Sequence, residues 1–244
     1  MRYLVFTSAG DNTNFDTLWI ADDQPYDIYV VYYGDSDERW NRYKAKVKYA
    51  ERRKGSKFQN FYHVYTHMAE LVSEYDYVFI LDDDILISPK DINAMFHIAE
   101  QYDLLICQPA FENRSIISHP ITKRSRGILL AYTNFVEVNV PLYSRAALAK
   151  LMSLYDTSLI GWGVDYLSVF ANGIAHTDRY AIVHSIGCSN PTLKDKGLVD
   201  RELELIPDWD KRKELWLDYA SKHGFYSYPL TTYKTLTLTD DQEV

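Results

Sequence analysis

The chain has 244 residues, of which 47% are apolar and 25% are charged, and its formal net charge is −8. This length and balance fit one domain with a substantial core, and the acidic charge excludes the basic footprint that nucleic-acid binding needs. No apolar run approaches the length of a membrane span, and the apolar stretch at the start is too short for a signal peptide. We therefore expect a cytoplasmic protein, with a peripheral contact at the inner face of a membrane left open.

The first half of the chain alternates between apolar strands and helices. Residue types and apolar spacing predict strands at 2–8, 26–34, 77–82 and 103–111, and helices at 14–21, 37–54, 61–75 and 88–102. The last of these helices has a well-defined start, because Ser88 is a good N-cap and Pro89 suits the first turn. This alternation predicts an α/β fold with a mostly parallel sheet flanked by helices.

The second half is less regular. A strand is predicted at 135–144, helices at 144–155 and 164–173, and a last buried strand at 180–187. In open α/β sheets, ligands bind beyond the carboxyl ends of the strands. Three predicted strand ends carry polar residues or glycine, at 7–10, 34–35 and 82–84, and these ends therefore mark a candidate ligand crevice.

Three consecutive carboxylates, Asp82, Asp83 and Asp84, follow the apolar strand "YVFIL". Crowded carboxylates are tolerated when a cation or strong donors compensate them. Alternation along an extended strand predicts Asp82 and Asp84 on one side, with Asp83 opposite. Two carboxylates on one side suit Mn²⁺ or Mg²⁺, which complete their shell with water and phosphate oxygens. The alternative is an acidic turn that caps the following helix.

The motif "FILDDD" resembles the Asp-x-Asp motif of nucleotide-sugar glycosyltransferases of the GT-A fold. A closer resemblance is to an uncharacterised glycosyltransferase-like family that is abundant in plants. It covers about residues 30–195 and rests on six segments: "YDYVFILDDDI" (75–85), "LICQPAF" (105–111), "HPITKRS" (119–125), "FVEVNVPLYSRAAL" (135–148), "GWGVDY" (161–166) and "IVHSIGCSNPTL" (182–193). The resemblance implies a Rossmann-like GT-A domain at 1–200, with a nucleotide-binding half at 1–110 and an acceptor half at 111–200. Residues 201–244 are expected to form a C-terminal helical extension and tail.

The segment "GWGVDY" is similar to a Gly-Trp-Gly-x-acid segment of many GT-A enzymes. The resemblance implies that Trp162 and Gly163 line the acceptor site and that Asp165 is the catalytic base. A carboxylate at a helix N-terminus is also fixed by backbone donors, so Asp165 as a simple helix-start residue is the alternative. His184 in the last strand resembles the third metal ligand of these enzymes, and a satisfied core histidine is an equal alternative.

Four other residues are candidates with plain alternatives. Glu137 lies alone among apolar residues and could bind an acceptor hydroxyl, be the true base, or face solvent. His119 with Arg124 could hold phosphate or an acidic sugar, or lie in an ordinary exposed loop. Lys57 could contact a diphosphate, but six other basic residues lie near it in the sequence.

The function that the resemblance implies is metal-dependent transfer of a sugar from a nucleoside-diphosphate sugar, UDP-sugar first, to a glycan or glycolipid hydroxyl. The first strands would bind the nucleoside, which places Thr7, Ala9 and Asp35 in contact with substrate. Asp82 and Asp83 would lie beside them, with Asp82, Asp84 and His184 around Mn²⁺ or Mg²⁺. The alternatives are a haloacid-dehalogenase-like phosphatase and a non-catalytic sugar- or nucleotide-binding protein.

Overall fold

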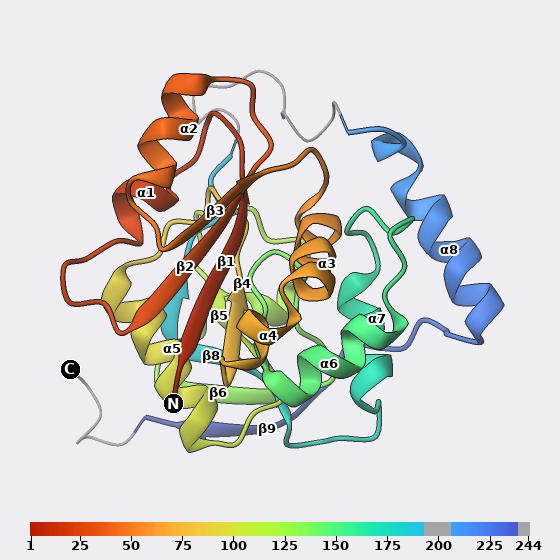
Figure 1. Cartoon of the computed structure of the whole chain (residues 1–244). Helices are drawn as coiled ribbons and strands as arrows, with labels where there is room; N and C mark the ends of the chain where they lie inside the picture. Colours follow the sequence, from red (N-terminus) through yellow and green to blue (C-terminus); the bar gives the residue numbers. More distant parts are fainter. Residues whose placement is uncertain (193–205, 239–244) are drawn as a thin grey trace.

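The structure is a computed structural model that describes residues 1–192 and 206–238 (Figure 1). The strands of the described residues form one nine-stranded sheet in the order β3-β2-β1-β4-β7-β5-β8-β6-β9. Their bounds are β1 Tyr3–Ala9, β2 Tyr26–Tyr32, β3 Tyr49–Arg52, β4 Tyr77–Ile80, β5 Ile106–Phe111, β6 Ile128–Thr133, β7 Leu142–Ser144, β8 Tyr180–Cys188 and β9 Thr232–Thr237. The α/β class is therefore confirmed.

The sheet is mixed, so the prediction of a mostly parallel sheet is wrong in that respect. β3, β2, β1 and β4 are parallel to one another, and β5 is parallel to β8. β7 lies antiparallel between β4 and β5, and both β6 and β9 pair antiparallel with their neighbours. The first half of the chain thus supplies the regular parallel part, and the second half closes it with antiparallel strands.

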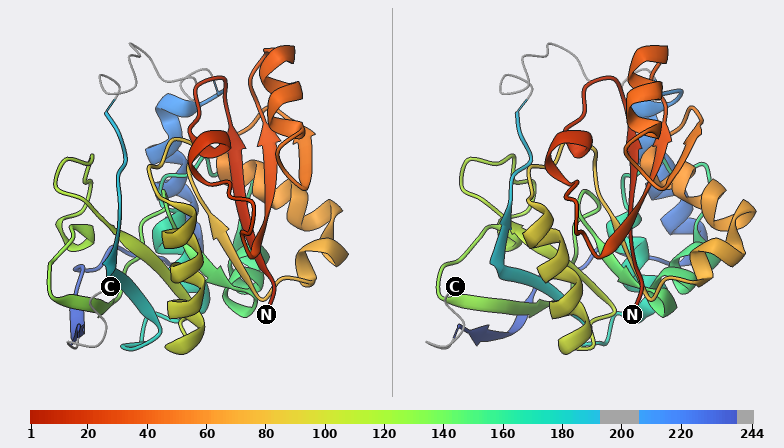
Figure 2. Two further views of the ribbon diagram at one scale, coloured as in Figure 1. Left: turned by 90° about the vertical axis from the view of Figure 1, so that its left-hand side faces the viewer. Right: turned by 60° about the vertical axis from the view of Figure 1, so that its left-hand side comes forward.

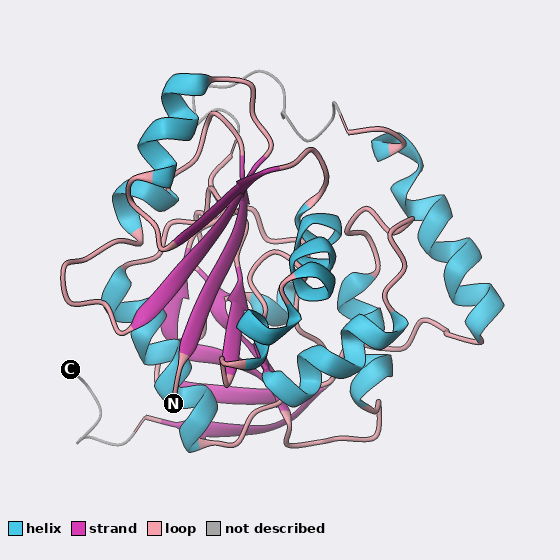
Figure 3. Cartoon of the chain, in the orientation of Figure 1, coloured by secondary structure: helices cyan, strands magenta, loops and turns pink. Residues whose placement is uncertain are grey.

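Helices cover both faces of the sheet (Figures 2 and 3). The first core cluster joins the sheet to α1, α2 and α5, through side chains such as Phe15, Tyr43 and Phe96. The second joins it to α3, α4, α6, α7 and α8. The helix bounds are α1 Phe15–Leu18, α2 Asp37–Lys44, α3 Lys57–His67, α4 Ala69–Ser73, α5 Pro89–Gln101, α6 Arg145–Leu154, α7 Val164–Asn172 and α8 Arg212–His223, with short 3-10 turns η1 Pro120–Thr122 and η3 Trp209–Lys211.

The predicted helix at 37–54 is wrong beyond Lys44. α2 ends there, and the chain then forms β3, which pairs with β2. The polar, basic sequence of this stretch gives a strand no apolar alternation, but Tyr49 stacks on Tyr29 at a ring distance of 5.7 Å. Tertiary pairing therefore overrides local propensity here.

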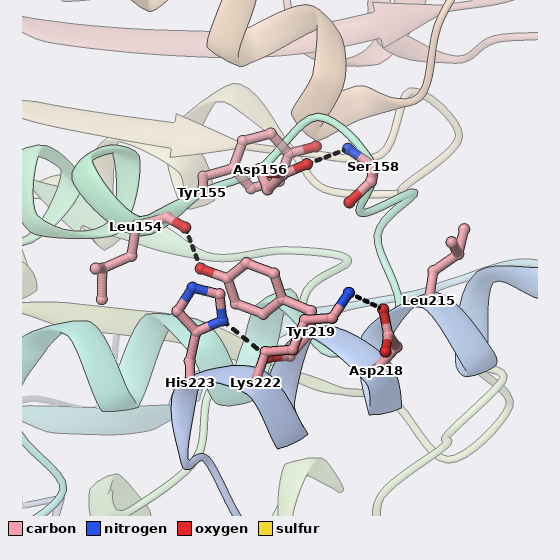
Figure 4. A pocket seen from close by; sticks show the side chains of 9 residues that line it. All are labelled: Leu154, Tyr155, Asp156, Ser158, Leu215, Asp218, Tyr219, Lys222 and His223. Atoms are coloured by element: carbon pink, nitrogen blue, oxygen red, sulfur yellow. Dashed lines mark hydrogen bonds and ion pairs between the residues drawn. The ribbon is translucent and has the colours of Figure 1, made fainter.

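The C-terminal segment contributes both a helix and a strand. α8 lies beside α7 (Figure 1), and β9 extends the sheet by pairing with β6. A cavity of 390 Å³ lies between α8 and the end of α6 (Figure 4). Its polar groups satisfy one another: Tyr219 donates to the carbonyl of Leu154, and Lys222 pairs with Asp218 at 2.6 Å. We interpret this cavity as part of the packing interface between α8 and the end of α6. In the described part of the chain, no helix is long and apolar enough to cross a bilayer.

Candidate active site

A second cavity of 390 Å³ lies beyond the carboxyl end of β4. It is bounded by the start of α3, the segment before β7, the glycine-rich turn before α7 and the C-terminal segment. The residues that line it are Ser56, Lys57, Phe58, Asp82, Ile116, Ser118, His119, Glu137, Val138, Asn139, Ile160, Gly161, Trp162, Gly163, Asp165, Tyr166, Asn190, Trp209 and Arg212. Seven predicted site residues are thus brought together: Lys57, Asp82, His119, Glu137, Trp162, Gly163 and Asp165.

The acidic triplet lies in a turn rather than in an extended strand. β4 ends at Ile80, and the amide of Ile85 donates to the carbonyl of Asp82 at 3.2 Å. The expected alternation of Asp82 and Asp84 against Asp83 therefore does not apply. Asp82 lines the cavity and pairs with Lys57, whose Nζ is 2.7 Å from Oδ1.

Lys57 supplies the positive charge at the triplet. Its ammonium is buried and also donates to the carbonyls of Val138 at 2.8 Å and Asn139 at 3.0 Å, with the carbonyl of Ile80 at 3.3 Å. Burial lowers the pKa of Lys57, and the charge of Asp82 opposes that shift. An ammonium has three N–H donors, and these acceptors occupy them. The geometry therefore favours an internal counterion over a contact to a diphosphate.

Asp83 and Asp84 tie the end of β4 to the loop that follows β1. The Asp83 carboxylate accepts from the amide of Gly10 at 2.9 Å. The carbonyl of Asp83 accepts from Thr13 Oγ1 at 2.7 Å, and the carbonyl of Asp84 accepts from Asn14 Nδ2 at 2.9 Å. Both aspartates are half-buried. The triplet thus organises the crevice at the ends of β1 and β4.

Asp165 and Glu137 are two buried carboxyl groups in the same cavity. Asp165 is the second residue of α7, and its Oδ1 accepts from the amide of Tyr166 at 2.9 Å. Burial raises the pKa of Asp165 to about 7. Glu137 accepts from Asn139 Nδ2 at 2.9 Å and from Thr122 Oγ1 at 3.4 Å. Burial, and next the charge of Asp165, raise the pKa of Glu137 to about 7. Such a pair can hold one proton and accept another near neutral pH.

Two glycines with left-handed backbone present Trp162 to the cavity. Gly161 has φ +110° and Gly163 has φ +85°, a conformation that other residues rarely adopt. The indole of Trp162 between them is 46% exposed, which is unusual for so large an apolar group. A Cβ on Gly163 would lie 2.0 Å from Trp216 Cδ2, so glycine there also lets α8 pack closely.

His184 and Arg124 are not among the residues that line the cavity. His184 Nδ1 accepts from the amide of Ser125 at 3.1 Å, and burial with the nearby Arg124 lowers the pKa of His184 to about 4. A neutral ring that accepts at Nδ1 carries its hydrogen on Nε2, which leaves no lone pair for a metal. Arg124 pairs with Glu112 and donates to the carbonyls of His184 and Ser185. Both patterns favour structural roles.

The remaining predicted residues lie elsewhere. Thr7 and Ala9 are fully buried in β1, and the hydroxyl of Thr7 has no hydrogen-bond partner among the described residues. Asp35 is exposed after β2 and pairs with Lys54 at 2.8 Å. His119 is half-buried at the cavity and packs on Phe135 with ring centroids 4.6 Å apart, and burial lowers its pKa.

Sequence reasoning missed Asn139, Asn190, Trp209 and Arg212 in the cavity wall. Asn139 is part of the segment "FVEVNV", where two positions after Glu137 it could have been expected to bond that carboxyl. Trp209 and Arg212 carry no such signal, because they come from a segment that matches no motif.

Among the described residues, no group of three or more His, Cys, Asp or Glu side chains is arranged to hold a metal ion. A cage of Asp82, Asp84 and His184 does not fit, given the hydrogen bond at His184. Mg²⁺ often uses only one or two carboxylates together with substrate phosphates and water. Asp82 lines the cavity and Asp84 follows two residues later in the same turn, so these two carboxylates are the candidates for an ion that substrate completes.

Comparisons with known proteins agree with the fold. The profile of a family described as "Protein of unknown function (DUF707)" matches residues 16–132. No curated protein matches the chain. The chain is similar to S. aureus TarS 1–349, with 11% identity over 91% of this chain and 72% of that chain, and a TM-score of 0.54. The complex of TarS 1–349 with UDP-GlcNAc is 10% identical over 91% of this chain and 66% of that chain, with a TM-score of 0.58. The complex of TarS 1–349 with UDP is 10% identical over 93% of this chain and 73% of that chain, with a TM-score of 0.52. The fold is thus GT-A-like.

Proposed function

We propose that the protein is a glycosyltransferase that moves a sugar from a nucleoside-diphosphate sugar to a hydroxyl group of a glycan or glycolipid. The observation that carries this proposal is the pair of buried carboxyl groups, Asp165 and Glu137, in a cavity at the carboxyl end of β4. The similarity of the fold to TarS in complex with UDP-GlcNAc supports it. The GT-A-like fold also speaks against a haloacid-dehalogenase-like phosphatase.

In this proposal Asp165 accepts the proton of the acceptor hydroxyl. A base works best when its pKa lies near the working pH, and burial raises the pKa of Asp165 to about 7. The charge on Asp165 favours the protonated form of Glu137, so Glu137 can donate a hydrogen bond to the acceptor. Direct attack by an activated hydroxyl implies inversion at the sugar carbon.

Asp82 and Asp84 are the residues that would hold Mn²⁺ or Mg²⁺, which stabilises the charge of a leaving diphosphate when bound. We expect the thermal stabilisation by UDP to increase when Mn²⁺ is added, and Asp84→Ala to remove the increase without unfolding the protein. Asp218→Ala is the matched control, because Asp218 is exposed in α8 and pairs with Lys222. Equal stabilisation with and without Mn²⁺ would contradict the metal assignment.

The function itself is tested by release of nucleoside diphosphate. The purified protein is incubated with UDP-, GDP- and CMP-sugars, with and without glycan acceptors, and the free nucleotide is measured. We expect release from a UDP-sugar, and a rate that rises with the right acceptor. Hydrolysis of p-nitrophenyl phosphate without nucleotide release would favour the phosphatase, and UDP binding without release from any sugar would favour the non-catalytic protein.

A further inference from the structure

The C-terminal segment forms part of the cavity wall. Trp209 in η3 and Arg212 at the start of α8 both line the cavity that contains Asp165. Neither residue lies within the range 16–132 that the family profile matches. The wall of the cavity is therefore built in part by a segment for which neither the sequence motifs nor the family match assigns a role.

This segment is held firmly in place. Trp216 of α8 is buried, and it stacks on Tyr166 of α7 with centroids 6.3 Å apart and planes inclined by 23°. Phe225 after α8 stacks on Phe170 at 4.7 Å. These contacts anchor α8 on α7, which begins next to Asp165. The position of Arg212 relative to the candidate base is thus fixed by packing.

The guanidinium of Arg212 is held in place by Trp209 through one ring contact and one hydrogen bond. It lies 4.4 Å over the ring of Trp209, and Nη1 donates to the carbonyl of Trp209 at 2.6 Å. A guanidinium has five N–H donors. Within residues 1–192 and 206–238, no carboxylate forms an ion pair with it. A half-buried cation whose donors remain available at a cavity wall suits an anionic group of a ligand.

The charges in the cavity favour binding of an anionic ligand group beside Arg212. The charge of Asp165 would repel an anion beside it, and the cation Lys57 is already paired with Asp82. Arg212 would attract the anion. Trp162 adds a large exposed aromatic face, on which the apolar C–H face of a sugar ring can pack. A sugar face and an acidic substituent are thus matched by neighbouring parts of one wall.

We propose that Trp162 and Arg212, with Trp209 as the support of the guanidinium, form an acceptor subsite for a saccharide that carries an anionic group. This proposal rests on the proposed function, because it names the acceptor class of the same site. Trp162 packs on the sugar ring, Arg212 binds the anion, and Asp165 accepts the proton of a hydroxyl on the same acceptor.

The test measures saccharide binding without any donor. Calorimetry compares glucose, glucuronate, glucose 6-phosphate and glucose 6-sulfate, and then short oligosaccharides with and without uronate or phosphate groups. We expect at least one acidic member to bind about tenfold or more tightly than its neutral partner, since a hydrogen bond to a charged group has that weight. Carboxylate and phosphate members distinguish the two sources of the anion.

Variants assign the effect to residues. Arg212→Gln should remove the acidic preference, Arg212→Lys should retain part of it, and Trp162→Ala should weaken neutral and acidic members alike. Lys213→Gln, at the exposed neighbouring position, is the control and should bind as the parent does. UDP affinity should be unchanged in Arg212→Gln.

Three outcomes would overturn the proposal: no acidic preference anywhere in the panel, an equal loss in Lys213→Gln, or a loss of UDP affinity in Arg212→Gln, which would place Arg212 in the donor site. Acidic-saccharide binding without nucleotide release from any sugar would keep the subsite and reject the transferase instead.

Discussion

Lys57 and Asp165 lie in the wall of one cavity, where burial disfavours the charged form of both, but their partners differ. The Lys57 ammonium is met by the Asp82 carboxylate and by backbone carbonyls. Asp165 accepts from the amide of Tyr166 and burial raises its pKa, and the charges that act on the pKa of Glu137 include two carboxylates, Asp165 and Asp82. The first arrangement fixes a charge and suits a structural role. The second leaves protons easily exchanged near neutral pH and suits catalysis.

The largest expected effect is on the rate of transfer. Asp165→Asn keeps the size of the side chain but cannot accept a proton at neutral pH. General-base catalysis contributes about 10²–10⁴-fold, so we expect the rate to fall at least about a hundredfold while UDP affinity is kept. Steady-state kinetics and calorimetry measure the two quantities.

Glu137→Gln is the matched control for Asp165→Asn, because it preserves the hydrogen bond from Asn139 but removes the second acid. A near-normal rate in Asp165→Asn with a collapse in Glu137→Gln would move the base to Glu137. Near-normal rates in both variants would reject a carboxylate base and favour a retaining reaction.

The next largest effect is on stability. Lys57→Met leaves Asp82 without its cation and removes one donor from each of three backbone carbonyls. Breaking a buried pair costs about 3–5 kcal/mol, and we expect about 3 kcal/mol because the Asp82 side chain is 31% exposed. Urea denaturation measures the loss. The double variant Lys57→Met/Asp82→Asn should recover part of it, and an unchanged Lys57→Met would contradict the structural role of the pair.

A smaller effect on the free energy of unfolding should distinguish alanine at Gly161 from alanine at Gly163. Alanine at either position costs about 1–2 kcal/mol in a left-handed backbone. At Gly161 an added Cβ meets no atom within 4 Å, whereas at Gly163 it meets Trp216 at 2.0 Å. Gly163→Ala should therefore destabilise the protein more than Gly161→Ala does, and it should weaken acceptor binding through α8. Equal free energies of unfolding would show that α8 is not held by this contact.

The sequence predicted the elements whose local residue pattern is strong. β1, β2, β4 and α5 follow from apolar runs and a capping signal, and Ser88 does cap α5, because its hydroxyl accepts from the amide of Asp91 at 3.1 Å. β3, β6 and β9 were missed because their stability comes from neighbouring strands rather than from local pattern. Long-range pairing of this kind leaves little trace in a short window of residues.

The residues of the candidate site also fall into those that a sequence pattern indicated and those that it did not. A resemblance in "GWGVDY" and a lone charge in "FVEVNV" pointed to Asp165 and Glu137, which lie in one cavity. The partner of Asp82 could not be singled out, because Lys57 is one of seven basic residues in a short stretch. Arg212 could not be found at all, since its place depends on how α8 docks. Their roles in catalysis and binding stay predictions until the variants are measured.

The smallest expected effect is a change in how stability depends on pH, and it tests the buried carboxyl pair directly. The pKa of Glu137 is about 7 in the folded protein and about 4.3 in an unfolded chain. Between these values the folded state binds more protons at Glu137, so the contribution of this group to stability is greatest below about pH 4 and falls as pH rises toward 7. Glu137→Gln should therefore flatten the fall by about 1 kcal/mol per pH unit or less, since one proton corresponds to about 1.4. Urea denaturation at pH 5, 6 and 7 measures the slope. Asp165→Asn should flatten it in the same direction because burial raises that pKa too, and slopes equal to the parent's in both variants would mean that the two carboxyl groups are not buried together.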